Sequence, residues 1–465
     1  MNDSAAKRES GKHFSPSTAQ SNLPSRLTPM EQLHQLRDSD SYPNAIVAKL
    51  IIEGEINREL FEQSMQFVAR RHEMVFAKIS SNQKRWLPSS SNDLQAKINW
   101  HEGEYDQSRH LLRPIRLNSD PSLLCDAFVG AKQTSLFMQM HHARVDGLGA
   151  MQVIREILRV YDNLYNQRAI DDALRRLDEG RFAKRGQIGL FQKGWWRRVP
   201  LQWIPAFGAA KFALAKVTHL LPEWKKETQP APLQNYLTYC RRRLDPQVLK
   251  QLRAGDRSAN DRLLAGLFLA IDRFQTEIKQ SRGNKKIRIV VPISIRERAD
   301  LRGTICNRVA LIQLDRADKD FADPEGLAWG INHELGFVSK YKFEKSFGIV
   351  LRLMSIVPGF FRWRIKRRSV RTTTVLTNLG TPFRKSKLPR QEGALTVGDL
   401  RLVDVELIPP VHDLIPAVFL FSTFEERSAI TINYDQRVIS RSQAERLLEI
   451  YFEEISRLVD ELPTD

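Results

Sequence analysis

A short apolar segment that runs directly into two adjacent histidines constrains the fold of this chain more than any other feature. Residues 135–140, SLFMQM, have the composition of a buried strand and are followed by HHARVDG, residues 141–147. Beyond Gly147, apolar residues recur at helical spacing, at positions 151, 154, 157, 158 and 161. The pattern therefore predicts a strand, a tight turn that holds the histidines, and a helix.

The chemistry of this turn depends on His142 and Asp146. An imidazole held at the end of a strand can project into a cleft, and its unperturbed pKa of ~6.5 suits a general base at neutral pH. Asp146 lies four residues after His142, and it either pairs with a cation or holds the imidazole. Structural histidines, or part of a metal site, are the alternatives. Adjacent strand residues point to opposite faces, so His141 and His142 diverge, which disfavours a shared metal.

Strand and helix patterns alternate through both halves of the chain, which predicts a mixed α/β fold. A proline-led helix is expected after Thr28, with Glu31 in its first turn. The expected organisation is a disordered polar leader, not a signal peptide, over 1–25, a first half over 26–175, a basic aromatic linker over 176–235 and a second half over 236–465.

Composition narrows the class of protein. Of 465 residues, 42% are hydrophobic and 27% are charged, as in globular proteins. The net charge of +18 favours an anionic partner, namely nucleic acid, a lipid surface or a CoA thioester. Nucleic acid is least favoured, because no recognition motif accompanies the charge. No apolar run reaches the ~18 residues of a membrane span, and the widely spaced Cys125, Cys240 and Cys306 are expected to be reduced thiols in the cytoplasm.

HHARVDG matches the HHxxxDG signature of the acyltransferase superfamily that resembles chloramphenicol acetyltransferase. That superfamily includes condensation domains of nonribosomal peptide synthetases, wax ester synthase/diacylglycerol acyltransferases, plant BAHD acyltransferases and alcohol acetyltransferases. Weaker similarity extends along nearly the whole chain, although Val75-Phe76 replaces the Leu-Arg pair that usually follows RHE. The similar segments are LTPMEQLHQL (27–36), FVARRHEMVFAKI (67–79), VPISIRERADLRGTICNRVALIQL (291–314), VLTNLGTPF (375–383) and AITINYDQRVIS (429–440).

The resemblance implies a role for each residue of the motif. His142 would be the catalytic base that deprotonates an acceptor hydroxyl or amine, and His141 would help to shape the site. Asp146 would be structural and would pair with Arg296 of the VPISIR segment. Gly147 would permit the turn and keep the substrate channel open.

The resemblance also implies two halves, each like chloramphenicol acetyltransferase, that form a pseudo-dimer with a tunnel between them. A thioester donor, either acyl-CoA or carrier-bound, and an acceptor would enter from opposite faces and meet at His142. Asn378 of TNLG would contact the thioester or the oxyanion. No metal, bound cofactor or covalent intermediate is implied. We expect a monomer with a hydroxyl acceptor; amide formation at an amine, or a catalytically silent binding protein, are the alternatives.

Two segments combine tryptophan and other aromatic residues with lysine and arginine, over 194–217 and 347–371. This combination is typical of an interfacial helix on anionic lipid. Core aromatics flanked by cations that extend to solvent are an equal alternative. The sequence therefore predicts a cytoplasmic acyltransferase for which an anionic membrane surface is a candidate partner.

Overall fold

The computed structural model describes most of both halves of the chain. Residue 25 apart, the expected leader lies outside the described residues, and so does most of the expected linker. The described residues are 25–89, 97–106, 112–121, 123–170, 174, 185, 215–221, 236–254, 258–296, 305–341, 344–357, 359–366, 372–384 and 386–460.

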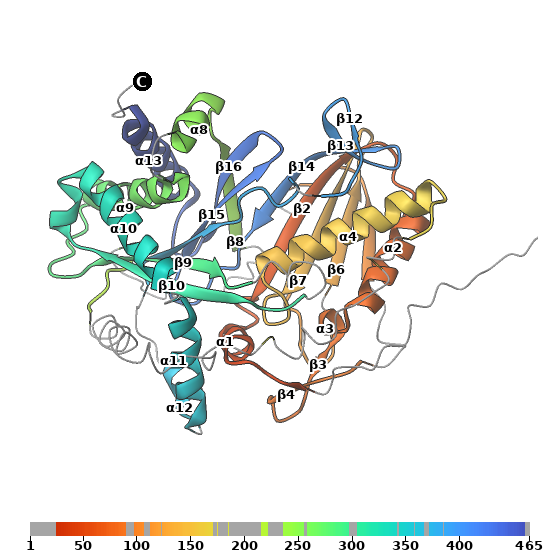
Figure 1. Cartoon of the computed structure of the whole chain (residues 1–465), viewed down its shortest axis with the longest axis horizontal. Helices are drawn as coiled ribbons and strands as arrows, with labels where there is room; N and C mark the ends of the chain where they lie inside the picture. Colours follow the sequence, from red (N-terminus) through yellow and green to blue (C-terminus); the bar gives the residue numbers. More distant parts are fainter. Residues whose placement is uncertain are drawn as a thin grey trace, which may run out of the picture.

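The described residues form a mixed α/β fold with two large sheets, as the sequence predicts (Figure 1). The first sheet, in spatial order, is β12 (Arg390–Gln391), β13 (Ala394–Val397), β14 (Leu400–Ile408), β2 (Ala45–Glu53), β7 (Gln133–His141), β6 (Leu123–Val129) and β5 (Lys97–Glu102). The second is β10 (Val309–Arg316), β9 (Ile287–Ser294), β11 (Thr374–Asn378), β15 (Ala417–Phe424), β16 (Arg427–Asp435) and β8 (Leu237–Arg243). A small third sheet joins β1 (Ser25–Arg26), β4 (Arg85–Leu87) and β3 (Lys78–Ile79).

Strands from the second half of the chain complete the sheet of the first half. β14 pairs with β2 in antiparallel register, with Leu407 opposite Ala48. β13 and β12 extend that sheet further outward. The two sheets are therefore not separated at the linker, and each half contributes to the packing of the other. Hydrophobic pattern identifies β14 as a strand, but it does not show which sheet β14 joins.

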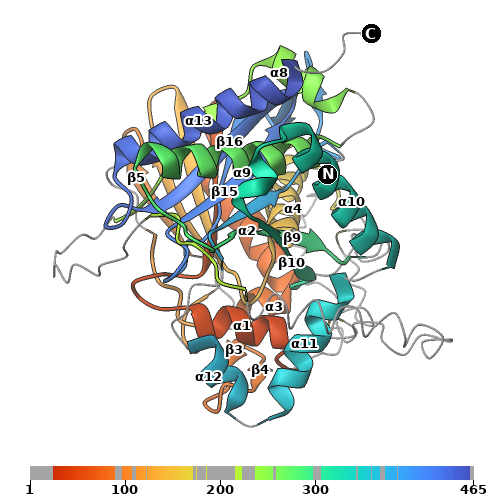
Figure 2. The same ribbon diagram turned by 90° about the vertical axis from the view of Figure 1, so that its left-hand side faces the viewer.

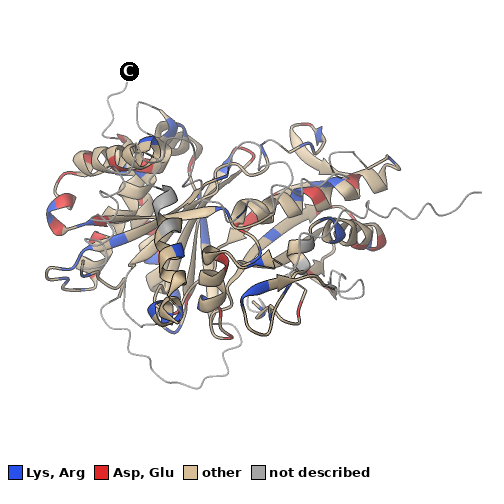
Figure 3. Ribbon diagram, turned by 60° about the horizontal axis from the view of Figure 1, so that its bottom comes forward, with Lys and Arg blue, Asp and Glu red and all other residues tan. Residues whose placement is uncertain are grey.

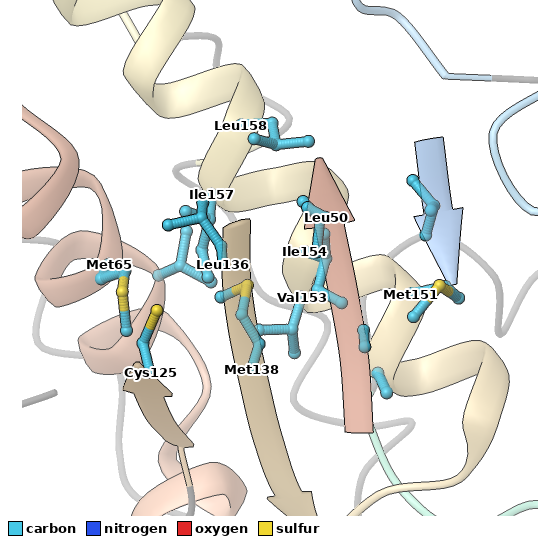
Figure 4. Close-up of a cluster of buried hydrophobic side chains, with 14 of the residues drawn as sticks. Leu50, Met65, Cys125, Leu136, Met138, Met151, Val153, Ile154, Ile157 and Leu158 are labelled. Carbon is cyan, nitrogen blue, oxygen red and sulfur yellow. The ribbon is translucent and has the colours of Figure 1, made fainter. Parts of the chain in front are cut away.

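A pair of helices covers each large sheet. α2 (Arg58–Arg71) and α4 (Gly147–Tyr165) pack together against the first sheet, and α9 (Ala259–Glu277) and α13 (Arg441–Asp460) pack together against the second (Figure 1). The apolar face that the sequence predicts for α4 is buried against β2, β6, β7 and α2 (Figure 4). The side chains labelled there include Leu50, Met65, Cys125, Leu136, Met138, Val153, Ile154 and Ile157.

The remaining helices lie around the two sheets. They are α1 (Pro29–Arg37), α3 (Glu73–Phe76), α8 (Pro246–Arg253), α10 (Pro324–Tyr341), α11 (Glu344–Ile356) and α12 (Phe360–Lys366), with a short 3-10 helix over Asp318–Phe321. α1 packs against α11 and α12 at one end of the molecule (Figure 2). The predicted start of α1 is confirmed: Thr28 caps it and Glu31 completes the capping box. None of the helices in the described ranges is long and apolar enough to cross a bilayer.

Candidate active site

The motif occupies the predicted turn between strand and helix. His141 is the last residue of β7, and Asp146 caps α4 by accepting a hydrogen bond from Gly149 N at 2.8 Å. Arg144 N donates to His141 O at 3.0 Å within the turn, and His142 N donates to Asn44 O at 2.8 Å. Backbone hydrogen bonds within the first half thus fix the position of the His142 main chain, from which the ring extends.

The Asp146 carboxylate joins the two halves of the fold. Its Oδ1 accepts from Arg296 Nη2 at 2.8 Å, and its Oδ2 accepts from Arg308 N at 2.8 Å. The Asp146 and Arg296 side chains are 1% and 2% exposed. The ion pair that the resemblance implies is therefore present, and these three hydrogen bonds, including that from Gly149, engage the carboxylate without the His142 ring.

The loop that precedes β10 holds the motif from the other side. Asn307 Nδ2 donates to His142 O, and Arg296 Nη2 also donates to Cys306 O. Gly149 is required beneath this contact, because a Cβ there would lie 2.7 Å from Val145 Cγ2 and 3.2 Å from Arg296 Nη2. Close packing of strand, helix and loop therefore sets the position of the candidate base.

The His142 ring lies in a buried environment that keeps it neutral. It stacks on His34 of α1, with ring centroids 3.9 Å apart and an interplanar angle of 14°. Burial lowers the pKa of His142 to about 4, although backbone carbonyls and Asp146 act in the opposite direction. Its Nδ1 is buried, so Nε2 is the nitrogen available to the adjoining cavity. A neutral imidazole with an accessible Nε2 can accept a proton at pH 7.

His141 points away from His142, as strand geometry predicts. Its side chain is 1% exposed, its Nδ1 accepts from Ala143 N at 3.0 Å, and its Nε2 lies 3.4 Å from Asp38 Oδ2. Burial lowers the pKa of His141, while Asp38 acts in the opposite direction. This ring ties the turn to the residue after α1 and does not line the cavity beside His142.

Asn378 lies at the end of β11 in the cavity wall, but its amide is already engaged. Its Oδ1 accepts from Gly380 N at 2.8 Å, and its Nδ2 donates to Asn260 Oδ1 at 3.2 Å. These bonds shape the strand end. The thioester contact expected for Asn378 would therefore compete with bonds that the side chain makes in this structure.

A cavity of about 330 Å³ lies between the two large sheets and reaches the motif. Its walls come from β2 and β14 of the first sheet, from β9, β10, β11 and β15 of the second, and from α1, α11 and α12. A second cavity of about 250 Å³ contains Arg155, Arg296 and Arg384 and shares Leu148 and Leu379 with the first. The two cavities therefore adjoin beside the motif, and the smaller one is lined by three arginines, of which Arg296 is paired with Asp146.

Gly147 keeps this junction open. It lines the larger cavity, and a Cβ at Gly147 would lie 3.1 Å from Leu379 Cδ2. Any larger side chain would press on Leu379, one of the two residues that both cavities share. The structure thus gives Gly147 a spatial role as well as a place at the start of α4.

Arg71 and His72, from the segment that resembles RHE, hold α2 against α4. Glu156 Oε2 accepts from Arg71 Nε at 3.0 Å and lies 2.6 Å from His72 Nε2. Burial alone would raise the pKa of Glu156, but His72 and Arg71 lower it to about 2. These residues support the helix that carries the motif and do not line either cavity.

Several residues that the sequence did not single out converge on His142. Asn307 and Arg308 bond to the motif, and His34, Arg37 and His412 line the cavity beside it. His34 and Arg37 are on the predicted first helix, whose facing residues the sequence cannot identify. His412 follows β14, and only the pairing of β14 with β2 brings it to the site. The described residues contain no group of three His, Cys, Asp or Glu side chains arranged to hold a metal ion.

Comparison with known proteins gives one short sequence match. No protein-family model matches the chain. Over 134 residues it is 27% identical to tyrocidine synthase 3 of Brevibacillus parabrevis, a match that covers 28% of this chain and 2% of that protein. This relative is thus far longer than the present chain, and the match concerns a small part of it.

Solved structures match nearly the whole chain. The epimerization domain from the third module of tyrocidine synthetase B has a TM-score of 0.67 at 12% identity, covering 94% of this chain and 98% of that one. The first condensation domain of the CDA synthetase has a TM-score of 0.62 at 13% identity, with 94% and 97% covered. A mutant starter condensation domain of rhizomide synthetase in complex with C8-CoA has a TM-score of 0.64 at 13% identity, with 95% and 98% covered. The chain therefore shares the fold of these condensation and epimerization domains.

Proposed function

We propose that this chain transfers an acyl group from a thioester donor to a hydroxyl acceptor, with His142 as the general base. The observation that carries the proposal is the neutral His142 ring in a cavity between the two sheets, beside a second cavity lined by arginines. The apolar wall of the larger cavity suits an acyl chain or an apolar acceptor, and Arg155 and Arg384 of the smaller one suit the phosphates of a CoA or a carrier arm.

The proposed reaction needs one proton acceptor and close approach of the two substrates. His142 Nε2 removes the proton of the acceptor hydroxyl as its oxygen bonds to the thioester carbonyl carbon. The tetrahedral intermediate then collapses, the carbon–sulfur bond breaks, and the proton on His142 passes to the departing thiolate. Proximity supplies much of the rate, and the proposed steps use neither a metal nor a bound cofactor.

The solved relatives support a thioester donor. One was solved with C8-CoA, and another crystal of the same domain contained C8-CoA and Leu-SNAC. Because several of these relatives are condensation domains, amide formation at an amine acceptor is the second candidate function. The presence of both His142 and the Asp146–Arg296 pair disfavours a silent binding protein.

The test is an acyl-transfer assay with the purified chain. Acyl-CoAs of several lengths are combined with alcohol or amine acceptors, free thiol is followed with a chromogenic reagent, and products are identified by mass spectrometry. We expect acceptor-dependent thiol release that His142→Ala abolishes while the folded state survives. Undiminished transfer by His142→Ala would exclude this base, and products formed only with amines would favour the amide alternative.

We also propose that α11 and α12 meet an anionic membrane surface. Leu353, Ile356 and Trp363 on these helices are 60%, 68% and 54% exposed, and Arg352 and Lys366 are exposed beside them. The same helices line the cavity that reaches His142, so an apolar substrate would enter from the lipid side. Elsewhere, basic and acidic residues are interspersed along the helices (Figure 3). An exposed apolar face bordered by cations fits anionic lipid.

A further inference from the structure

Arg37, the last residue of α1, lines the cavity that contains His142. The residue is exposed to solvent, and partial desolvation by the surrounding protein nevertheless lowers the pKa of its guanidinium. Within the described part of the chain, no carboxylate pairs with it and no hydrogen bond engages it. Arg37 is therefore a cation in the cavity wall without a protein counter-ion among those residues.

The nearest carboxylate in sequence, that of Asp38, has other partners. Its Oδ1 accepts from Asn44 N at 2.8 Å, and its Oδ2 lies 3.4 Å from His141 Nε2. These contacts anchor the motif turn to the end of α1. Asp38 thus serves the framework of the site, and the Arg37 charge stays available to the cavity.

Two neutral histidines, His34 and His412, line the same cavity as Arg37 and His142. Burial lowers the pKa of both His34 and His412 well below the ordinary value, and each ring also interacts electrostatically with Arg37 and with His142. Asn44 Nδ2 lies 3.2 Å from His34 Nδ1, so Nδ1 accepts and the N–H of His34 is at Nε2. The buried Nδ1 of His412 has no hydrogen-bond partner among the described residues.

An unpaired cation in a cavity of this kind favours an anionic ligand. A ligand that fills the cavity displaces water from this cation, and an opposite charge with hydrogen bonds compensates for that loss. A guanidinium presents two parallel N–H groups that match the two oxygens of a carboxylate, and neutral imidazole N–H groups add uncharged donors. Arg37 supplies the one positive charge among Arg37, His34 and His412, which matches the single negative charge of a carboxylate.

We propose that Arg37, His34 and His412 form a subsite for the carboxylate of the acceptor. The inference rests on the acyl transfer proposed above and names its acceptor class, a small hydroxy acid or amino acid. Because His34 stacks directly on His142, the carboxylate and the attacking heteroatom would be separated by a short carbon skeleton. The acyl chain of the donor would then lie along the apolar part of the same cavity, away from Arg37, His34 and His412.

The first test compares matched acceptors. Thiol release from octanoyl-CoA is measured with 3-hydroxybutyrate and with its neutral amide, 3-hydroxybutyramide, and the corresponding amino compounds are run in parallel. We expect kcat/KM to be roughly 10- to 100-fold higher for the acid, the range of one charge-assisted hydrogen-bonded pair. In Arg37→Gln, kcat/KM for the acid should fall to the value for the amide, while kcat/KM for the amide should change little.

Arg253→Gln is the matched control. Arg253 is also the last residue of a short helix that begins with proline, and it is exposed and lines neither cavity. The Arg253→Gln variant should therefore keep the preference of the unaltered protein for the acid over the amide. Equal use of acid and amide by the unaltered protein, or an unchanged preference in Arg37→Gln, would overturn the subsite while leaving acyl transfer itself established.

A binding measurement separates this inference from the proposed function. Calorimetric titration of the His142→Ala variant with N-octanoylglycine and with N-octanoylglycinamide does not depend on catalysis. We expect the acid to bind roughly 10- to 100-fold more tightly, and the added substitution Arg37→Gln to remove the difference. This result would support the subsite even if no acyl transfer were detected. Equal binding of acid and amide, or tighter Arg37-dependent binding of octyl phosphate, would overturn the carboxylate assignment.

Discussion

Breaking the Asp146–Arg296 ion pair is the perturbation whose cost the structure allows to be worked out in most detail. Asp146→Ala removes the α4 cap and leaves the Arg296 guanidinium, 2% exposed, without its carboxylate. Loss of an N-cap costs ~1 kcal/mol, and loss of one partner of a buried pair costs about 3–5 kcal/mol. We expect Asp146→Ala to lower the free energy of unfolding by an amount near the sum.

Arg296→Ala should lower the free energy of unfolding by less than Asp146→Ala does, because Asp146 keeps two of its three hydrogen-bond donors, Gly149 N and Arg308 N. Each single variant leaves one buried ion without its partner, whereas the double variant removes both charges and leaves no unpaired ion. The two single effects should therefore exceed the double effect by on the order of 2 kcal/mol, within the range that contacting residues show.

The assay is a double-mutant cycle on denaturant unfolding, with amide hydrogen exchange of residues 141–155 as a local readout. Exchange is needed because a chain with two large sheets need not unfold in a single step. The exposed Arg441–Glu445 pair, at 2.8 Å, is the control cycle and should give a much smaller coupling, because solvent screens both charges. Additive effects of Asp146→Ala and Arg296→Ala, within error, would refute the pairing as the source of stability.

Other predictions concern protonation, the support of α4, and the exposed helices. Because the pKa of His142 is lowered to about 4, kcat/KM should stay level as pH falls from 8 to about 5 and then decline through pH 4; a midpoint near the ordinary value of ~6.5 in a pH–rate profile would contradict this. Glu156→Gln should lower the free energy of unfolding by about 3–5 kcal/mol, since its buried basic partners lose their carboxylate. Glu102→Gln, at an exposed pair, should cost at most ~1 kcal/mol in the same denaturant titration. Sedimentation with anionic liposomes should show binding that weakens with salt and is lost on joint substitution of Leu353 and Ile356 by serine; salt-insensitive binding, or none, would remove the proposed membrane surface.

The sequence predicts local structure and charge pairing well here, because both leave a short-range signal. Thr28 and Glu31 form the capping box that their spacing indicates, and the change of period after Gly147 marks the start of α4. The pair of Asp146 and Arg296 follows from a resemblance that covers both segments. The helix signals lie within a few consecutive residues, and the ion pair follows from two short motifs that the resemblance links.

Convergence from distant segments could not be predicted in this way. β14 joins the first sheet although it follows most of the second along the chain, and that pairing brings His412 toward His34 and Arg37. Hydrophobic alternation is the same for a strand in either sheet. The sequence likewise marks Asn378 as polar, but it does not show that Gly380 and Asn260 already use its amide.

The placement of His142 depends on both halves of the fold at once. Its backbone N–H bonds to Asn44 in the first half, whereas its carbonyl accepts from Asn307 in the second. Asp146, four residues later, is held from the second half by Arg296 and Arg308. A general base must lie within hydrogen-bond reach of its proton donor, and small displacements cost large factors in rate. The interface between the halves is therefore part of the catalytic geometry, because relative movement of the sheets would shift the imidazole and the cavity walls together.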